Sequence, residues 1–355
     1  MSKELRYIIE QISVEKGLSK ETLMETLETA MLSAIKKRYT EPENLGIIIN
    51  TNNYDFEAYR DKTVVEKVEN PNLHISLEEA LSIDENFKLE ETARVPIEIK
   101  DFGRIAVQTA KQAIFQKVRE AERDMIFEEF SHKLGSIVSG SVNRKERGVY
   151  VINIGKAELF LPQKETISGE HLKIGSTVRA LIDSVSHTSK GPQIILSRIK
   201  PEFVVELFRL EVPEINDGSV VVKKAVREAG ERSKIAVASN DASIDPVGAC
   251  VGMKGSRVQS IVRELRGERI DIINWSDDPR VLISRALTPA TVDKIGINED
   301  DNVALAIVED SQLSVAIGKK GINVRLAMKL TGWDIDIMSE TKYSTMKLED
   351  VESVS

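Results

Sequence analysis

The chain has 355 residues, of which 41% are hydrophobic and 30% are charged, and its formal net charge is −8. This length allows about two to four domains, and the apolar fraction is too high for wholesale disorder. No apolar run approaches the roughly 18 residues that a membrane-spanning helix needs. A single cysteine, Cys250, excludes an intramolecular disulfide. Together with the absence of a signal peptide, it predicts a cytoplasmic protein without a membrane association.

The first part of the chain is predicted to be a mixed α/β domain. Leu5, Ile8 and Ile12 have the spacing of one face of an amphipathic helix, which Gly17 ends, and Ser19 can cap a second helix. Strands are expected at residues 46–50, 62–68 and 93–99, with Pro96 favouring a sheet edge, and Ser76 with Glu79 forms a possible capping box for a short helix.

Residues 103–133 contain neither proline nor glycine after their first position and predict one long helix. This helix carries four basic residues of interest, Arg104, Lys111, Arg119 and Arg123, among several acidic ones. On composition alone, a helix face of mixed charge is usually solvated surface, so these residues gain a role only if other observations assign one.

Residues 135–200 differ from the rest of the chain in net charge and in the pattern of residue types along the sequence. They hold ten Lys and Arg against five Asp and Glu, whereas the chain as a whole is acidic. Five short β-rich runs, separated by Gly, Pro and charged turns, predict a small closed barrel of the S1-type OB-fold. Such barrels bind single-stranded nucleic acid through basic and aromatic side chains. The RNA-binding candidates are Arg144, Lys145, Arg147, Arg198, Lys200, Tyr150 and Phe160, and the alternative for the two rings is a place in the core.

An internal repeat follows the barrel. Gly252 and Gly255 align with Gly318 and Gly321 at an offset of 66 residues, and each pair is followed by Gly and then Ile-Asp-Ile. Each copy is predicted as two strands, a helix, Gly-x-x-Gly, a second helix and a strand, with one further helix upstream. The order α-β-β-α-α-β is that of a KH domain.

The Gly-x-x-Gly loops carry the most specific functional signal. Glycines let a sugar-phosphate backbone approach closely, and the N-terminus of the following helix offers free N–H groups and a positive dipole. KH domains clamp about four nucleotides of single-stranded RNA with this loop. The candidates besides the four glycines are Met253, Lys254, Arg257, Lys319, Lys320 and Arg325.

The same glycines do not predict a nucleotide-triphosphate site. Neither Gly155–Lys156 nor Gly318–Lys319 has the flanking Gly and Ser/Thr of a P-loop, and no Gly-x-Gly-x-x-Gly occurs. The four histidines are scattered without ligand spacing, and no pair of acidic residues stands out for acid–base chemistry. We therefore expect no catalytic site, no metal and no cofactor.

The sequence resembles the NusA family of bacterial transcription elongation, termination and antitermination factors over about residues 1–340. The resemblance is carried by QKVREAERDMIFEEF, by DPVGACVGMKG and by AIGKKGINVRLAMKLTGWDIDIM. It implies a multidomain α+β chain: residues 1–133 an RNA polymerase-binding domain, 134–200 the barrel, 201–276 and 277–340 the KH domains, and 341–355 a flexible tail. Some members carry acidic repeats after the second KH domain, and we expect the functions tied to those repeats to be absent from this chain.

The resemblance also implies partners. These are the RNA polymerase core near the flap of its β subunit, nascent single-stranded RNA and other Nus-type antitermination factors, with the chain a monomer. The basic long helix would face the polymerase through Arg104, Lys111, Arg119 and Arg123. The alternative is a KH/S1-type accessory module of RNA decay or ribosome assembly. In the decay enzyme polynucleotide phosphorylase, however, the barrel comes last, whereas here it precedes the KH repeats.

Overall fold

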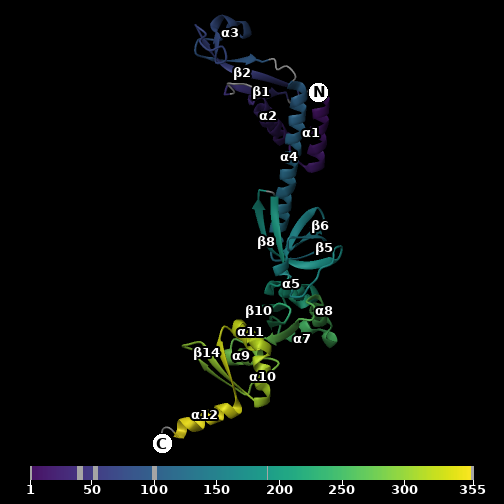
Figure 1. Ribbon diagram of the computed structural model, residues 1–355, viewed down its shortest axis with the longest axis vertical. Helices are drawn as coiled ribbons and strands as arrows, with labels where there is room; N and C mark the ends of the chain where they lie inside the picture. The colour runs from purple at the N-terminus through teal and green to yellow at the C-terminus, as the bar shows by residue number, and fades with distance from the viewer. Residues whose placement is uncertain (1, 38–42, 51–54, 98–101, 190, 353–355) are drawn as a thin grey trace. The chain divides into compact units, whose positions relative to one another are not determined.

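The computed structural model describes residues 2–37, 43–50, 55–97, 102–189 and 191–352, and within these ranges all side chains except those of 2–5, 102–107 and 347–352. The chain divides into two compact units between Met125 and Ile126. Figure 1 labels helices and strands of both units. Among the described residues, no helix is long and apolar enough to cross a membrane.

The first unit begins with two helices and a small sheet. Ser19 caps the second helix, its side chain accepting a hydrogen bond from the Thr22 amide at 3.1 Å, and Ser76 caps the third in the same way through the Glu79 amide at 3.3 Å. Both predicted caps are confirmed. The elements are α1 (Ser2–Lys16), α2 (Lys20–Lys36), β1 (Leu45–Ile49), β2 (Phe56–Val65), β3 (His74–Ser76), α3 (Leu77–Ile83) and β4 (Thr92–Pro96).

The sheet of this unit is organised around β2. This strand pairs antiparallel with β1 and β4 and parallel with β3, so β4 lies at an edge and Pro96 is tolerated there. The strand expected at 62–68 is the end of β2, which starts earlier and stops at Val65, and residues 98–99 of the strand expected at 93–99 lie outside the described residues. The three-residue strand β3 has no periodicity to reveal it and was not predicted.

The predicted long helix is confirmed as α4 (Phe102–Ser131). In the first unit its residues Ala110, Ile114 and Val118 are buried in one cluster with residues of α1 and α2, such as Ile9 and Leu23. Past the division, Phe130 is buried in the core of the barrel. The spacing of four residues between Ala110, Ile114 and Val118 is the helical repeat that the alanine-rich sequence predicts.

The second unit opens with the predicted five-stranded barrel. The strands close in the order β5-β6-β7-β9-β8, and alternate residues of β7 are buried. At Gly140 a Cβ would lie 2.6 Å from the Ile152 Cγ2, so only glycine fits where β5 meets β6. The strands are β5 (Ile137–Glu146), β6 (Val149–Ile154), β7 (Ala157–Pro162), β8 (Thr177–Thr188) and β9 (Gly191–Ser197), with the 3-10 helix η1 (Gln163–Glu165) after β7.

Two α-β-β-α-α-β repeats follow, as predicted. In each, the first two strands are antiparallel and the last joins the second in parallel. The first repeat has α5 (Pro201–Glu211), α6 (Pro213–Asn216), β10 (Val220–Glu228), β11 (Arg232–Ser239), α7 (Pro246–Val251), η2 (Met253–Gly255), α8 (Ser256–Glu264) and β12 (Arg269–Asn274). The second has α9 (Pro279–Ala286), β13 (Lys294–Asn298), β14 (Val303–Val308), η3 (Asp310–Gln312), α10 (Leu313–Ile317), η4 (Lys319–Gly321), α11 (Ile322–Thr331) and β15 (Asp334–Ser339).

Shared cores join these pieces of the second unit. Ile167 and Leu181 of the barrel belong to the same buried cluster as Phe203 and Phe208 of α5. A second cluster contains Val226, Ala236 and Ile273 of the first repeat together with residues of the second, including Leu282, Ile283 and Leu326. Apolar burial therefore holds the barrel to the first repeat and the first repeat to the second.

The segment after the second repeat differs from the prediction. Residues expected to be an irregular tail form α12 (Glu340–Glu352). The Ser339 Oγ accepts a hydrogen bond from the Lys342 amide at 3.4 Å, and the segment contains no Gly or Pro, so a helix starts and continues there although its apolar periodicity is weak. Residues 353–355 lie outside the described part of the chain.

Candidate nucleic acid interface

The two Gly-x-x-Gly loops adopt the same backbone conformation. Gly252 has φ 73° and ψ 173°, and Gly318 has φ 75° and ψ 169°. This region is open essentially to glycine alone. Lys254 and Lys320 are both left-handed, with φ of 51° and 55°. The two copies of the sequence repeat therefore have the same loop geometry.

The following helix packs closely against the first glycine of each loop, which is a second reason why this position requires glycine. A Cβ on Gly252 would lie 2.7 Å from the Arg257 Cγ, and one on Gly318 would lie 2.7 Å from the Asn323 Cβ. The last glycine of the second loop, Gly321, has nothing within 4 Å of a hypothetical Cβ. The loop is thus packed on its inner side and open on its outer side.

Different side chains brace the two loops from the same position. Arg257 donates from Nη1 to the Ala249 carbonyl at 2.6 Å and pairs with Glu214 at 2.9 Å. At the matching position, the buried Asn323 donates from Nδ2 to the Ala316 carbonyl at 2.9 Å. Arg257, predicted to contact RNA, is therefore engaged in holding its loop, and Asn323, which was not among the predicted site residues, does the same for the second loop.

The side chains between the glycines point outward. Met253 is 89% exposed, and Lys254, Lys319 and Lys320 are exposed as well. The three ammonium groups have no side-chain partner among the described residues. Each loop leads into a helix, α8 or α11, whose positive dipole end lies at the loop. The first helical amide, that of Ser256 or Ile322, donates to the carbonyl of Met253 or Lys319 within the loop. Cations and helix dipole thus face solvent at the same place, where an anionic backbone would be stabilised.

Arg325 lies one turn into α11 and is also exposed. Its Nη2 is 3.6 Å from a carboxylate oxygen of Glu228. This pair is loose and solvated, so Arg325 can exchange Glu228 for a phosphate at little cost.

On the barrel, Arg144 is paired within the protein. Its guanidinium contacts Glu158 in a bidentate manner at 2.6 and 3.0 Å and Glu146 at 2.6 Å. The hydrogen bonds with Glu158 and then Glu146 raise the pKa of Arg144, and those from Arg144 lower the pKa of the Glu158 carboxyl. Since two carboxylates neutralise Arg144, it offers a phosphate less than the sequence suggests.

The prediction that Tyr150 stacks on RNA is wrong. Tyr150 is 3% exposed and belongs to the barrel core. The Lys145 Nζ lies 4.7 Å from the centroid of its ring and donates to its hydroxyl at 3.2 Å. Phe160 is half-buried and alternates along β7 with buried residues, so it lies on the outer face of the barrel, where a base can reach it. Arg147 occupies the turn between β5 and β6, with φ 46°, and is exposed.

Arg198 is also removed from the RNA-binding candidates, because it is 2% exposed. It pairs with Glu170 and with Glu264, each at 2.9 Å, and donates to the Arg179 carbonyl. Lys200 remains accessible, although its Nζ lies 3.2 Å from Asp183, a contact that raises the pKa of Lys200 through its hydrogen bond.

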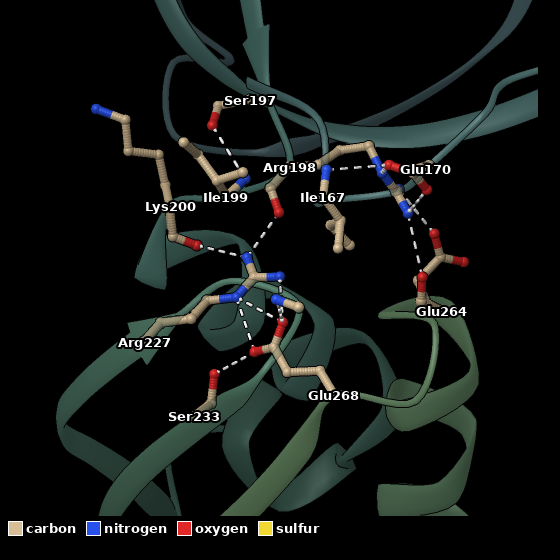
Figure 2. A network of polar contacts seen from close by, with 11 residues as sticks. Ile167, Glu170, Ser197, Arg198, Ile199, Lys200, Arg227, Ser233, Glu264 and Glu268 are labelled. Carbon is tan, nitrogen blue, oxygen red and sulfur yellow. Dashed lines mark hydrogen bonds and ion pairs between the residues drawn. The ribbon is translucent and has the colours of Figure 1, made fainter. Parts of the chain in front are cut away.

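Arg198 belongs to a buried polar network between the barrel and the first repeat (Figure 2). On the repeat side, the Glu268 carboxylate accepts hydrogen bonds from Arg227, the Gly230 amide and the Ser233 hydroxyl. Arg227 in turn donates to the carbonyls of Arg198 and Lys200, at 2.7 and 3.1 Å. Arg227 and Glu268 have side-chain exposures of 1% and 0%. The network therefore joins the end of the barrel to the first repeat.

The predicted polymerase-facing cations of α4 are only partly described. The side chain of Arg104 lies outside the described residues, whereas Arg119 is exposed and Lys111 and Arg123 are half-buried. Nearby, the Lys16 Nζ lies 2.6 Å from Glu122, and this hydrogen bond raises the pKa of Lys16.

The described part of the chain contains no group of three His, Cys, Asp or Glu that could hold a metal ion. Cys250 is fully buried in α7, and burial raises the pKa of its thiol to about 12, so it is a small core residue.

Family models match the chain in three places. Residues 4–124 match the NusA N-terminal domain, 198–275 the NusA-like first KH domain and 279–345 the NusA-like second KH domain. The chain is 44% identical to the transcription termination/antitermination protein NusA of Halalkalibacterium halodurans, over 100% of this chain and 93% of that protein. It is 45% identical to the protein of the same name from Bacillus subtilis, over 96% of this chain and 92% of that one.

The chain belongs to the NusA family of transcription termination/antitermination proteins. A third relative, from Rickettsia prowazekii, is 40% identical over 98% of this chain and 70% of its own length. The barrel occupies the residues between the first and second matches, so the order predicted from the sequence is the order of this NusA-family chain.

Three residues near the second loop of this NusA-family chain were missed by the sequence analysis. Arg232 donates from Nη1 to the Asn323 Oδ1 at 3.1 Å, and Arg269 lies beside Arg232 on the neighbouring strand. Arg232 and Arg269 begin β11 and β12 outside the Gly-x-x-Gly motif, so only the sheet register brings them to the loop. The offset of 66 residues from Arg257 was the one signal that could have singled out Asn323.

Proposed function

We propose that the chain is a non-enzymatic transcription elongation factor that binds the RNA polymerase core and nascent single-stranded RNA. It promotes pausing and hairpin-dependent termination, and joins antitermination complexes with other Nus-type factors. The proposed domains are those expected from the sequence, with residues 1–133 as the polymerase anchor, near the β-subunit flap. The observation that carries the proposal is the shared, outward-facing geometry of the two Gly-x-x-Gly loops.

RNA binding by the loops follows from their electrostatics. A phosphate placed over the N-terminus of α8 or α11 meets the positive end of the helix dipole and one or two lysines, without a side chain in the way. The packing that joins the two repeats holds both loops in one body. An RNA strand that is bound at one loop therefore reaches the other loop at a high effective concentration.

The salt dependence of RNA binding measures how many RNA phosphates the basic side chains contact. Five of the cations predicted to bind RNA are exposed and have no carboxylate partner among the described residues, namely Lys254, Lys319, Lys320, Lys145 and Arg147. If they contact about five phosphates, the logarithm of the affinity is expected to fall with the logarithm of the salt concentration at a slope of about −3 to −4. Filter binding or fluorescence anisotropy across a salt series measures the slope, and a slope near zero would show that these cations are not an RNA surface.

Docking on the polymerase explains how modest RNA affinity suffices. An anchored factor presents its RNA-binding domains to the emerging transcript at about millimolar local concentration. The first unit has no RNA-binding motif, and Arg119 and Arg123 of α4 lie in the segment whose counterpart is expected to face the polymerase.

Reversing the charges of Arg119 and Arg123 tests the anchor. The variant Arg119→Glu/Arg123→Glu is expected to bind core polymerase about tenfold more weakly, while its affinity for free RNA is unchanged. The control is Lys20→Glu/Lys88→Glu, which makes the same change of charge at exposed sites elsewhere in the first unit. Co-sedimentation with core polymerase measures both, and equal binding by the two variants would place the anchor elsewhere.

The alternative is a KH/S1-type accessory module of RNA decay or ribosome assembly. The described residues contain no cluster of His, Cys, Asp or Glu that could hold the metal ion of a metal-dependent decay enzyme. Phosphate-dependent shortening of RNA by the purified chain, or co-purification with ribosomes in place of polymerase, would favour this alternative.

A further inference from the structure

A polar hollow of about 250 Å³ lies where the first KH repeat meets the loop of the second. The first repeat contributes Glu231, Arg232 and Arg269, and the second contributes Lys319 and Asn323. We call this hollow the inter-KH pocket. Three of its five named side chains are cationic and one is anionic, so it carries an excess of positive charge.

The two arginines of the inter-KH pocket lie side by side. Arg232 and Arg269 are register partners at the start of the parallel strands β11 and β12. Like charges at neighbouring positions of a sheet are destabilising unless a counter-charge compensates them. Asp271 lies 3.3 Å from the Arg232 Nε, but it is shared with the buried Lys234, whose Nζ lies 2.8 Å away. One carboxylate thus serves two cations.

The remaining cations of the inter-KH pocket have no such partner. Arg269 is exposed, and neither its guanidinium nor the Lys319 ammonium has a side-chain partner among the described residues. The buried Arg232 Nε has no hydrogen-bond acceptor, because Asp271 is close enough for an ion pair but not aligned for a bond. Arg269 and Lys319 are therefore available to an anionic ligand, whereas the buried Arg232 Nε faces Asp271.

The second loop is positioned against the inter-KH pocket by Asn323. This side chain accepts a hydrogen bond from the Arg232 Nη1 at 3.1 Å and donates to the Ala316 carbonyl just before the loop. The second loop is therefore tied to the sheet of the first repeat. An RNA strand held at that loop passes the pocket, whose volume suits a single phosphate with its sugar rather than a peptide segment.

We propose that the inter-KH pocket binds one phosphodiester group of a single-stranded RNA that lies across both Gly-x-x-Gly loops. Arg269 and Lys319 supply the charge, and Arg232 supplies hydrogen-bond donors while it keeps Asn323 and the loop in place. This proposal rests on the proposed RNA-binding function. It adds a contact outside both Gly-x-x-Gly motifs, at the point where the two repeats meet.

The test uses the full chain and RNA oligonucleotides of about twelve nucleotides, long enough for two sites of about four nucleotides each. A set of oligonucleotides carries one uncharged methylphosphonate linkage each, at successive positions. Loss of one phosphate contact is expected to weaken binding about fourfold at about 0.15 M salt. For the unaltered chain, we expect this loss at several linkages, one of which belongs to the inter-KH pocket.

The variant Arg269→Gln identifies that linkage. It is expected to bind the unmodified oligonucleotide about fourfold more weakly, with a salt slope smaller by about 0.7, and to be insensitive to neutralisation at one linkage only. The control Arg280→Gln removes an exposed, unpaired arginine of α9 that does not line the pocket, and should retain every linkage effect of the unaltered chain.

Three other outcomes overturn the proposal. If Arg269→Gln keeps the linkage pattern of Arg280→Gln, the pocket does not hold the RNA backbone, although the RNA-binding function stands. If inorganic phosphate, exchanged for chloride at constant ionic strength, competes with RNA in the unaltered chain but not in Arg269→Gln, and no linkage effect is lost, the pocket takes free phosphate instead. If the unaltered chain binds none of the oligonucleotides, the proposed function fails as well.

Discussion

Replacing Glu268 by Ala is expected to lower the free energy of unfolding of the second unit by about 3–5 kcal/mol, the cost of leaving a buried charge without its partner. Glu268 and Arg227 have side-chain exposures of 0% and 1%, and the carboxylate also accepts from the Gly230 amide and the Ser233 hydroxyl. Its removal leaves these donors without an acceptor. Urea unfolding followed by the fluorescence of Trp275 and Trp333, both of which pack on the core shared by the repeats, measures the change.

Two further variants separate the buried charge from a general effect of mutation. Glu228→Ala removes a partly exposed carboxylate that lies 3.6 Å from Arg325 and is expected to cost less than about 1 kcal/mol. Arg227→Met/Glu268→Met replaces both charges by apolar side chains and should recover much of the loss, since a buried pair adds little net stability over such a replacement. Equal urea midpoints for Glu268→Ala and Glu228→Ala would contradict the account of the network.

Placing acids in both loops is expected to reduce the affinity for single-stranded RNA by at least about a hundredfold at moderate salt. The variant replaces Met253–Lys254 and Lys319–Lys320 by Asp-Asp, so that carboxylates stand at the helix N-termini where phosphates are expected. The fold should tolerate the change, because the side chains are exposed and Asp is among the residues that adopt the left-handed backbone of Lys254 and Lys320 most readily.

A charge-matched comparison guards against a merely global effect. Lys319→Asp/Lys320→Asp and Lys294→Asp/Lys329→Asp change the net charge by the same amount, and all four lysines are exposed residues of the second repeat. Only the first pair lies in a loop. If both variants lose RNA affinity equally, with unchanged circular dichroism, the loops have no special role.

The elements that the sequence predicted correctly are those encoded by local patterns. The apolar spacing of α1, the capping serines and the strand–turn repeats of the barrel depend on residues a few positions apart, and the structure has each of them. The KH order could be predicted because the chain contains it twice, so that one copy supported the other. The short β3 and the helix α12 were missed, since neither has a strong apolar period.

The errors in the candidate site have a different origin. Tyr150 lies in the run Val149–Tyr150–Val151, where every residue is apolar or aromatic and no alternation shows which one faces inward. Arg198 has the composition of a surface cation, and its partners Glu170 and Glu264 lie 28 and 66 residues away in the sequence. The residue types in the sequence were therefore enough to predict the loops. Which cations remain available to RNA depends on burial and ion pairing, and these depend on the fold.

We expect the paired loops to act on nascent RNA during transcription. The most direct measurement is the dwell time of a reconstituted elongation complex at a hairpin-stabilised pause, with the unaltered chain, with the four-residue loop variant or with Lys294→Asp/Lys329→Asp. Each is added at a concentration that saturates the polymerase. We expect the unaltered chain and the control to prolong the pause and the loop variant to lose most of this effect while still binding polymerase. A loop variant that prolongs the pause as fully as the unaltered chain would contradict the account.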